Sequence, residues 1–342
     1  MRINIVKLII IIDVFVVVFA LIVGTAVVIV AMELNKAPAS TQGEAFFEVE
    51  QGETSRSIGR RLEEAGVIKS RHFWYVVNRI DKDVIKAGAY TIRLPATQFE
   101  IHNILETGRQ PLIKVTIPEG ATLAKTARLF DEAGVCTEEA FMEAALNPEI
   151  LEAFQIPAKT FEGYLFPDTY LFQENYNAKR VVRIMAETFF KRLSSIVDVA
   201  SLTPEELFEK VRLASIVERE YRLAEEAPLM AGVFYNRLAV GMALQSCATV
   251  EYIITEIQHK PHPEIISTAD TEIENPYNTY RAEGLPPGPI SAPGLTALSA
   301  AFNPVLSEYL FFRLVDPNVG KHYFSKTFDE HIKAGKLYVK GK

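Results

Sequence analysis

The segment Leu213–Glu220, with the sequence LASIVERE, predicts an amphipathic helix that carries a carboxylate on its apolar side. At about 100° per residue, one narrow stripe of this helix holds Leu207, Val211, Ala214 and Glu218. A carboxylate among apolar neighbours is costly to ionise, so its pKa should rise. A carboxylic acid that is still protonated near neutral pH can donate a proton to a leaving group. Glu218 is therefore the first candidate for a catalytic residue.

This segment lies within a mainly helical part of the chain. Between residues 257 and 294 the composition shifts to Pro, His, Asn, Thr and Gly, which predicts a long loop region of the kind that often carries function. Leu310–Val315 and Lys321–Phe324 predict a closing hairpin, followed by a helix that ends at Ala334. We predict one mainly helical domain with a small C-terminal sheet over residues 119–342. Its good helical patterns cover Arg180–Leu193, Pro204–Tyr221 and Glu226–Leu238.

Strands and helices alternate in the preceding region, residues 44–118, so the fold class is α+β. Strand, Gly-containing turn, helix and Ala-Gly-Val follow one another twice, over Phe47–Val67 and Val115–Val135. Thr54 is placed to cap the first of these helices. We interpret the two copies as a weak internal repeat and predict a separate α/β subdomain over residues 44–118.

The N-terminal run from Leu8 to Met32 is almost continuously apolar and long enough to span a bilayer. Arg2 and Lys7 precede it, so the positive-inside rule places the N-terminus in the cytoplasm and the rest of the chain outside. A cleaved signal peptide is the alternative, although its apolar region is usually only about 7–15 residues long. We predict a cytoplasmic stub and transmembrane anchor over residues 1–36, with a small-residue linker over 37–43.

Composition excludes some functions. The formal net charge is -7, which argues against a nucleic-acid-binding protein but is compatible with a glycan partner. The two cysteines, Cys136 and Cys247, are far apart in sequence and predict an unpaired, buried pair rather than a disulfide framework. His259 and His262 lack nearby ligand partners, so a solvated loop is expected there and no metal or cofactor is predicted.

Four polar clusters rich in Tyr, Asn, Gln and Thr stand out from the core pattern. Aromatic rings can cover the apolar face of a sugar while amides bond its hydroxyls, and such sites are mostly apolar with a few placed polar groups. Each residue taken alone could serve turns or the core edge. Together with Glu218, the clusters favour a glycan site. They are Glu162–Tyr170, Phe234–Leu238 with Leu244–Ser246, Asn275–Tyr280 with Gly284–Ile290, and His322–Thr327.

At these residues the chain resembles the YceG-like (MltG) family of membrane-anchored endolytic murein transglycosylases of bacteria. The resemblance covers the whole chain, including the anchor, and it implies a LysM-like, peptidoglycan-binding character for residues 44–118 and a YceG-like catalytic domain for 119–342. The strings that carry it are Glu162–Tyr170, Leu213–Glu218, Val233–Leu238, Gly241–Ser246, Tyr277–Tyr280 and Gly284–Ile290.

The resemblance implies that Glu218 is the catalytic acid and base. It also implies that the glycan cleft is lined by Asn236, Gln245, Asn278 and Tyr280, and we add Tyr164 and Glu162 from the first matching string to the substrate-binding candidates. One departure occurs at Cys247-Ala248, where many relatives carry Asp-Pro. An acidic residue at that position therefore has no part in this protein's mechanism.

A single carboxyl group suffices if the substrate supplies its own nucleophile, whereas hydrolytic glycosidases normally need two. The resemblance therefore implies cleavage between MurNAc and GlcNAc of peptidoglycan with formation of 1,6-anhydroMurNAc ends, terminating nascent strands at the bacterial cytoplasmic membrane beside penicillin-binding synthases. Two alternatives stay open: a non-catalytic peptidoglycan-binding scaffold, and a hydrolytic muramidase with Glu162 or Asp168 as a second carboxylate.

Overall fold

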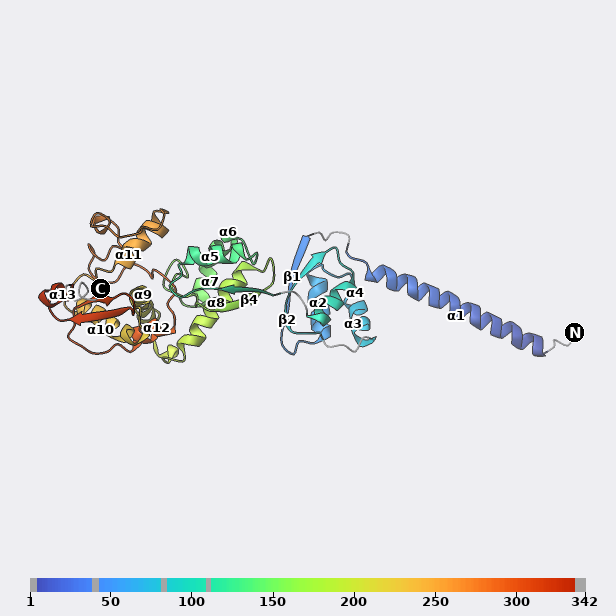
Figure 1. Ribbon diagram of the computed structural model, residues 1–342. Coiled ribbons are helices and arrows are strands. Elements are labelled where there is room, and N and C mark those ends of the chain that lie inside the picture. Colours follow the sequence, from blue (N-terminus) through green and yellow to red (C-terminus); the bar gives the residue numbers. More distant parts are fainter. Residues whose placement is uncertain (1–4, 39–42, 81–84, 109–111, 336–342) are drawn as a thin grey trace. The chain divides into compact units, whose positions relative to one another are not determined.

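The computed structural model describes residues 5–38, 43–80, 85–108 and 112–335 of the 342-residue chain (Figure 1). The chain divides into two compact units, Met1–Leu112 and Ile113–Lys342. Helices predominate, and the described strands form two-stranded antiparallel sheets. The mixed helix and strand composition that the sequence predicts is thereby confirmed.

The first unit begins with the long apolar helix α1 (Ile5–Asn35). Within the described residues, Val14–Asn35 is the one stretch that is long and apolar enough to cross a membrane. Most of its large apolar side chains are exposed, as a helix surrounded by lipid requires. The predicted apolar N-terminal helix is confirmed as a candidate membrane span, and its orientation stays a prediction.

The C-terminal end of α1 is attached directly to the rest of the first unit. The Nζ of Lys69 lies 3.1 Å from an oxygen of Glu33, and the side-chain amide of Gln98 donates to the carbonyl of Leu34 at 3.0 Å. The backbone N–H of Phe99 donates to Oδ1 of Asn35 at 3.1 Å. These contacts hold the end of α1 against the rest of the unit. The linker over residues 37–43 stays a prediction, because residues 39–42 lie outside the described residues.

The remainder of the first unit packs three helices against a two-stranded sheet. Thr54 caps α2 through the backbone N–H of Ser57, as the sequence predicts, and Thr97 forms a capping box with Glu100. Trp74 is fully buried at the centre of the core. The LysM-like character of this unit stays a prediction. The elements are β1 (Gly43–Val49), α2 (Ser55–Glu64), α3 (Arg71–Ile80), β2 (Gly88–Leu94) and α4 (Gln98–Thr107).

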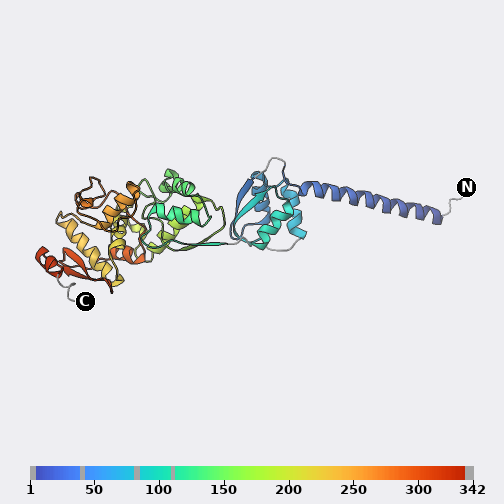
Figure 2. The same ribbon diagram turned by 45° about the horizontal axis from the view of Figure 1, so that its top comes forward.

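The second unit begins at Ile113 rather than at residue 119. Strand β3 (Ile113–Thr116) pairs antiparallel with β4 (Thr169–Phe172), which ties the strand to this unit by backbone hydrogen bonds. The predicted boundary after residue 118 thus differs from the boundary between the two compact units, which lies before Ile113. In Figures 1 and 2 the helices that follow gather with β4 in one part of the unit. They are α5 (Leu123–Glu132), α6 (Glu138–Ala145), α7 (Pro148–Ala153) and α8 (Ala178–Leu193).

The other part of the second unit is built around α9 (Pro204–Glu220), which packs against α10 and α12. The predicted helices at 180–193, 204–221 and 226–238 are confirmed as α8, α9 and α10. Short helical turns interrupt the connections: η1 (Val199–Ser201), η2 (Ala224–Glu226), η3 (Ile253–Ile257) and η4 (Asp270–Glu272). The longer elements are α10 (Ala227–Ala239), α11 (Cys247–Tyr252), α12 (Leu295–Phe302), β5 (Phe311–Asp316), β6 (Lys321–Ser325) and α13 (Phe328–Ala334).

The predicted loop region is confirmed, since η4 is the only helix or strand among residues 258–294, all of which the structure describes. The predicted hairpin is confirmed as β5 and β6, and Thr327 caps the last helix. The pair α11 and η3 was not predicted, because Cys247–Ile257 gives no clear start signal: Ser246 precedes α11 without a capping hydrogen bond from its side chain.

Gly59 tests the packing of the first unit, because its α2 position faces the ring of Trp74. A Cβ at this residue would lie 2.5 Å from Cδ1 of Trp74, whose ring is fully buried and whose Nε1 donates to the carbonyl of Ser55 at 3.2 Å. We expect Gly59→Ala to lower the free energy of unfolding of this unit by about 2 kcal/mol, because overpacking outweighs the gain in helix propensity. Urea unfolding followed by the fluorescence of Trp74, the chain's only tryptophan, measures it.

The matched control is Glu64→Ala, an exposed substitution on the same helix, which should leave stability within about 0.5 kcal/mol of the parent. A stabilisation of Gly59→Ala by the ~1 kcal/mol that helix propensity alone provides would contradict the packing argument.

Candidate active site

Helix α9 presents Glu218 from the end of a buried apolar stripe. Its N-terminus is fixed by a capping box between Thr203 and Glu206 with Pro204 in the first turn. Leu207, Val211 and Ala214 are buried as predicted, whereas Glu218 is half-buried. The helix therefore holds the carboxyl group where the protein core gives way to solvent.

Two donors contact the carboxyl group of Glu218. The backbone N–H of Gly294, the residue that precedes α12, donates to Oε2 at 2.9 Å. The hydroxyl of Tyr221, just beyond the end of α9, lies 3.4 Å from Oε1. Burial raises the pKa of Tyr221 to about 12, so this hydroxyl stays protonated and can donate. The carboxyl is thereby oriented at both oxygens.

Three segments that are distant in sequence meet at this carboxyl group. The N–H of Ile290 donates to Oγ of Ser215 at 3.0 Å, and the hydroxyl of Ser291 donates to the carbonyl of Ser215 at 3.0 Å. Ala292 exchanges backbone hydrogen bonds with the turn before α5: the N–H of Gly120 donates to its carbonyl at 2.9 Å, and its own N–H donates to Ala121 at 2.7 Å. The loop 290–294 thus joins α9 to the turn 118–121.

A second carboxylate, Glu119, lies beside the first. A Cβ at Gly294 would fall 1.9 Å from Oε1 of Glu119, so the Glu119 carboxylate occupies the space over this glycine, while Gly294 itself bonds to Glu218. Gly294 has a φ of -77°, so a glycine is required here by space rather than by backbone freedom. Glu119 was not among the predicted site residues, because Pro118-Glu119-Gly120 has the composition of an ordinary turn.

The surroundings shift the pKa of Glu218 towards neutrality. Burial is the largest cause and raises the pKa to about 7; the N–H of Gly294 acts in the opposite direction, and the negative charge of Glu119 adds to the rise. Both protonation states are therefore populated near neutral pH. Such a group can donate a proton and take one back within a single reaction cycle.

A groove of about 490 Å³ opens next to this carboxyl group. It reaches the site at Gly120, where an added Cβ would lie 3.8 Å from Cγ of Glu218. On its wall Glu251 pairs with both Arg219 and Nε2 of His262, the latter at 2.8 Å. The histidine that was expected in a solvated loop thus has an acidic partner. The lining is Gly120, Thr122, Lys125, Arg128, Arg219, Glu251, Thr255, Glu256, Lys260, Pro261 and His262.

Among the described residues no group of three or more His, Cys, Asp or Glu side chains is placed to hold a metal ion. Glu251 and His262 form a pair only. The groups around Glu218 are a backbone N–H, a tyrosine hydroxyl and a single further carboxylate. The chemistry that this arrangement can perform is accordingly proton transfer.

Two of the predicted glycan-binding amides are engaged within the protein. The amide of Asn278, which is fully buried, donates to the carbonyls of Thr271 and Ile273 at 2.9 and 2.8 Å. The amide of Asn236 donates to the carbonyls of Ser307 and Tyr309 at 2.8 and 2.9 Å. In this structure the NH₂ groups of both side chains are used in hydrogen bonds to backbone carbonyls of neighbouring loops.

Gln245 and Tyr280, by contrast, are accessible and lie on neighbouring segments. Gln245 is exposed, has a φ of 50° and donates its backbone N–H to the carbonyl of Thr279 at 3.0 Å. The hydroxyl of Tyr280 lies 3.0 Å from Sγ of Cys247. Cys247 is exposed and Cys136 only half-buried; the cysteines are unpaired as predicted, but the prediction that they are buried is wrong, because Cys247 starts α11 at the surface.

Glu162 and Tyr164 lie in the interior. Both oxygens of Glu162 accept from the N–H of Leu123, at 3.1 and 3.0 Å, so this carboxyl caps α5. Burial raises the pKa of Glu162 to about 8 against the effect of that N–H. Tyr164 is fully buried, and its hydroxyl has no hydrogen-bond partner among the described residues.

Asp168 pairs with Arg192 at 2.8 Å, which holds the pKa of Asp168 below its usual value. The second carboxylate that the structure brings to Glu218 is therefore Glu119. Neither of the two acids that were considered for that position on sequence grounds makes a contact with Glu218 in the described residues.

Known proteins resemble this chain over most of its length. An endolytic murein transglycosylase of Streptococcus pneumoniae is 31% identical over 315 residues, which cover 83% of this chain and 56% of the relative. An endolytic murein transglycosylase of Bacillus subtilis is 28% identical over 314 residues, or 86% of this chain and 84% of the relative. The chain thus spans little more than half the length of the Streptococcus protein.

The fold is also shared with a solved structure. A crystal structure of a YceG-like protein from Listeria monocytogenes matches with a TM-score of 0.58 and 29% sequence identity, covering 86% of this chain and 99% of that one. Residues 47–336 match the model of the YceG-like family. Since this match takes in both units and the whole neighbourhood of Glu218, the chain belongs to the YceG-like family.

Proposed function

We propose that this protein is a peptidoglycan lytic transglycosylase in which Glu218 acts first as the general acid and then as the general base. The observation that carries the proposal is the half-buried Glu218 carboxyl, whose pKa is raised to about 7 and whose side chain lies beside Gly120 in the lining of a groove. Membership of a family with relatives named endolytic murein transglycosylase supports the substrate class.

In the first step the protonated Glu218 gives its proton to the glycosidic oxygen between MurNAc and GlcNAc, and the bond from that oxygen to C1 of MurNAc breaks. The resulting carboxylate then takes the proton of the MurNAc C6 hydroxyl, whose oxygen bonds to C1. The products are a free GlcNAc hydroxyl and a 1,6-anhydroMurNAc end, so no water is consumed. Acid and base assistance of this kind contributes about 10²–10⁴-fold to the rate.

The neighbours of Glu218 have distinct parts in this scheme. The Gly294 N–H holds one oxygen and stabilises the carboxylate that forms after the first transfer. The Tyr221 hydroxyl lies at the other oxygen, and the charge of Glu119 keeps the proton on Glu218 at higher pH. Gln245 and Tyr280 are the accessible candidates for glycan contact, while Asn236 and Asn278 support loops with their amides.

The location follows from α1. A membrane span over Val14–Asn35 would keep the catalytic unit at the surface of the cytoplasmic membrane, with the N-terminus in the cytoplasm and both units outside. New glycan strands are made at that surface, so we propose that the protein terminates nascent strands, beside penicillin-binding synthases. This placement rests on the charges around α1, Arg2 and Lys7.

Glu119 favours a second candidate reaction, hydrolysis by a muramidase. A carboxylate beside the general acid is what a hydrolase needs, either to activate water or to bond to the sugar. The two reactions are distinguished by their products, because a hydrolase leaves a reducing MurNAc end and a lytic transglycosylase leaves an anhydro end.

Glu218→Gln tests the role of this residue as the acid. The amide keeps the shape of the side chain and cannot transfer a proton, so we expect the rate of strand cleavage to fall at least about 100-fold while the fold is retained. Mass spectrometry of products from purified glycan strands measures the anhydro ends, and circular dichroism checks the fold. Normal formation of anhydro products by the folded variant would rule out Glu218 as the acid. Reducing ends from the parent protein would favour the muramidase.

The pH dependence of cleavage tests the protonation state of Glu218. Since the reaction starts from protonated Glu218, activity should fall as the pH rises through about 7. Glu119→Gln removes a negative charge that favours the protonated form, so the pKa of Glu218 should fall and the alkaline limb of the pH–rate profile should move to lower pH.

The same variant separates the two candidate reactions. In a lytic transglycosylase, Glu119→Gln should keep most of its activity at a pH below the shifted limb and still yield anhydro ends. In a muramidase, loss of the second carboxylate should abolish the formation of reducing ends at every pH. Asp168→Asn is the matched control, since Asp168 is engaged by Arg192, and it should leave the limb where it is.

A further inference from the structure

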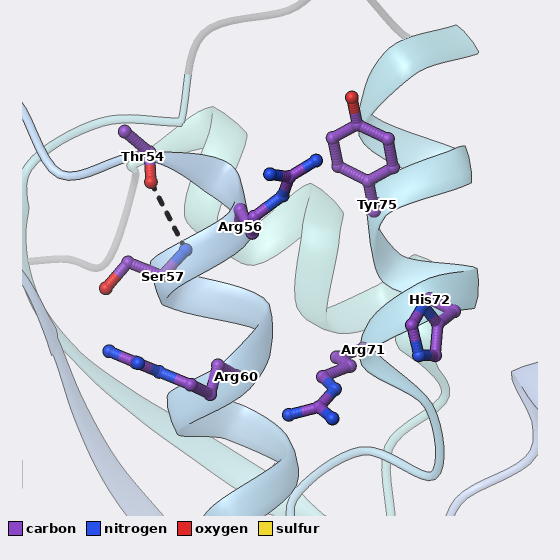
Figure 3. Close-up of a pocket in the computed structure, with 7 residues that line it drawn as sticks. All are labelled: Thr54, Arg56, Ser57, Arg60, Arg71, His72 and Tyr75. Atoms are coloured by element: carbon purple, nitrogen blue, oxygen red, sulfur yellow. Dashed lines mark hydrogen bonds between the residues drawn. The ribbon is translucent and has the colours of Figure 1, made fainter.

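A basic pocket lies in the first unit, remote in sequence from Glu218. It has a volume of about 510 Å³ and is formed by the N-terminal turns of α2 and α3. Figure 3 shows the side chain of Arg71 between the two helices, that of Arg56 directed towards Tyr75, and that of Arg60 extending from α2 on the side away from α3. The lining residues are Thr54, Arg56, Ser57, Arg60, Arg71, His72 and Tyr75.

The charge of this pocket is of one sign. Three of its lining residues are arginines and none is acidic, in a chain whose net charge is -7. Arg71 is paired with Glu63 at 3.3 Å, but Arg56 and Arg60 form no ion pair within the described residues. The guanidinium carbon of Arg56 lies 5.2 Å from the centre of the Tyr75 ring. Such a pocket favours an anion, and guanidinium groups match the oxygens of phosphate in particular.

The pocket lies close to the point where the candidate membrane span ends. Lys69, two residues before Arg71, is paired with Glu33 in the last turn of α1. With Val14–Asn35 as the span, about 20 residues fill the hydrocarbon core and the last turn reaches the headgroup region. A membrane spanned in this way would place the start of α3 near the lipid phosphates, because Lys69 is paired with Glu33.

Exposed apolar side chains continue from the end of α1 along the neighbouring face of α3. Phe99, whose N–H bonds to Asn35, is 52% exposed and packs edge-on against Phe73, with ring centres 5.9 Å apart. Val76 and Ile80 follow Phe73 at helical spacing and are 49% and 78% exposed. An apolar stripe beside a basic face is the pattern of a helix that lies at a membrane surface.

We propose that this pocket binds the phosphate of an anionic phospholipid headgroup, and that the first unit rests on the membrane through Arg56, Arg60 and the stripe of Phe73, Val76, Ile80 and Phe99. The volume suffices for a headgroup, and the two unpaired guanidinium groups supply donors for its oxygens. The inference rests on α1 as the membrane span and is independent of the chemistry at Glu218.

The test uses the full-length protein purified in a neutral detergent and measures retained lipid by native mass spectrometry. Dioleoylphosphatidylglycerol should bind in preference to dioleoylphosphatidylcholine. Arg56→Gln/Arg60→Gln should weaken binding of the anionic lipid at least tenfold. If the double variant does not fold, Arg60→Gln alone is used, and it should also weaken this binding. Both arginines are exposed on α2, and glutamine keeps the helix propensity.

The matched control is Lys114→Gln/Lys159→Gln, which removes the same charge from exposed positions in the second unit and should bind as the parent does. An equal loss in this control would overturn the proposal, because it would show general charge attraction. The proposal would also be overturned if the protein retained the two lipids equally, or if the pocket variants bound the anionic lipid as the parent does. Displacement of the lipid by millimolar inorganic phosphate would assign the pocket to a soluble phosphate instead.

Discussion

The hydrogen bond from the Gly294 N–H to Glu218 is the constraint on which the proposed active site depends. It exists only because loop 290–294 is fixed at both sides, by Ser215 of α9 and by the backbone of Gly120 and Ala121. Gly294 has no side chain, and the Glu119 carboxylate occupies the space that a Cβ at this position would need. One short loop thus sets the orientation and the electrostatic surroundings of the acid.

This arrangement balances opposing effects on one proton. Burial and the neighbouring negative charge favour the neutral carboxyl, and the backbone N–H favours the ionised one. The N–H of Gly294 therefore lowers the pKa of Glu218, while burial and the charge of Glu119 raise it. The raised but moderate pKa of Glu218 suits a cycle in which the same group acts in both directions.

Local patterns in the sequence were sufficient for part of this picture. The helical stripe of α9 predicted that Glu218 leaves an apolar face, and the periods of α8 and α10, the C-terminal hairpin and the last helix were predicted from short-range signals. These features depend on residues a few positions apart, where backbone geometry alone decides which side chains share a face.

The other features of the site and the unit boundary depend on which distant segments of the chain come into contact. Hydrophobic periodicity does not predict such contacts. Glu119 is brought to Glu218 through Ala292, far along the chain from both. Asn278 has the composition of a sugar-binding or turn residue, and only the tertiary structure shows that its amide holds Thr271 and Ile273. The unit boundary likewise moved to Ile113 because β3 finds its partner in β4, a pairing set by packing.

The attachment of the first unit to the end of α1 has a practical consequence for anyone who removes the anchor to obtain a soluble protein. Removal of residues 1–35 would leave the Gln98 amide and the Phe99 N–H without their acceptors, beside the exposed ring of Phe99. Aggregation of such a fragment would then report the loss of a native contact surface rather than a defect in the catalytic unit.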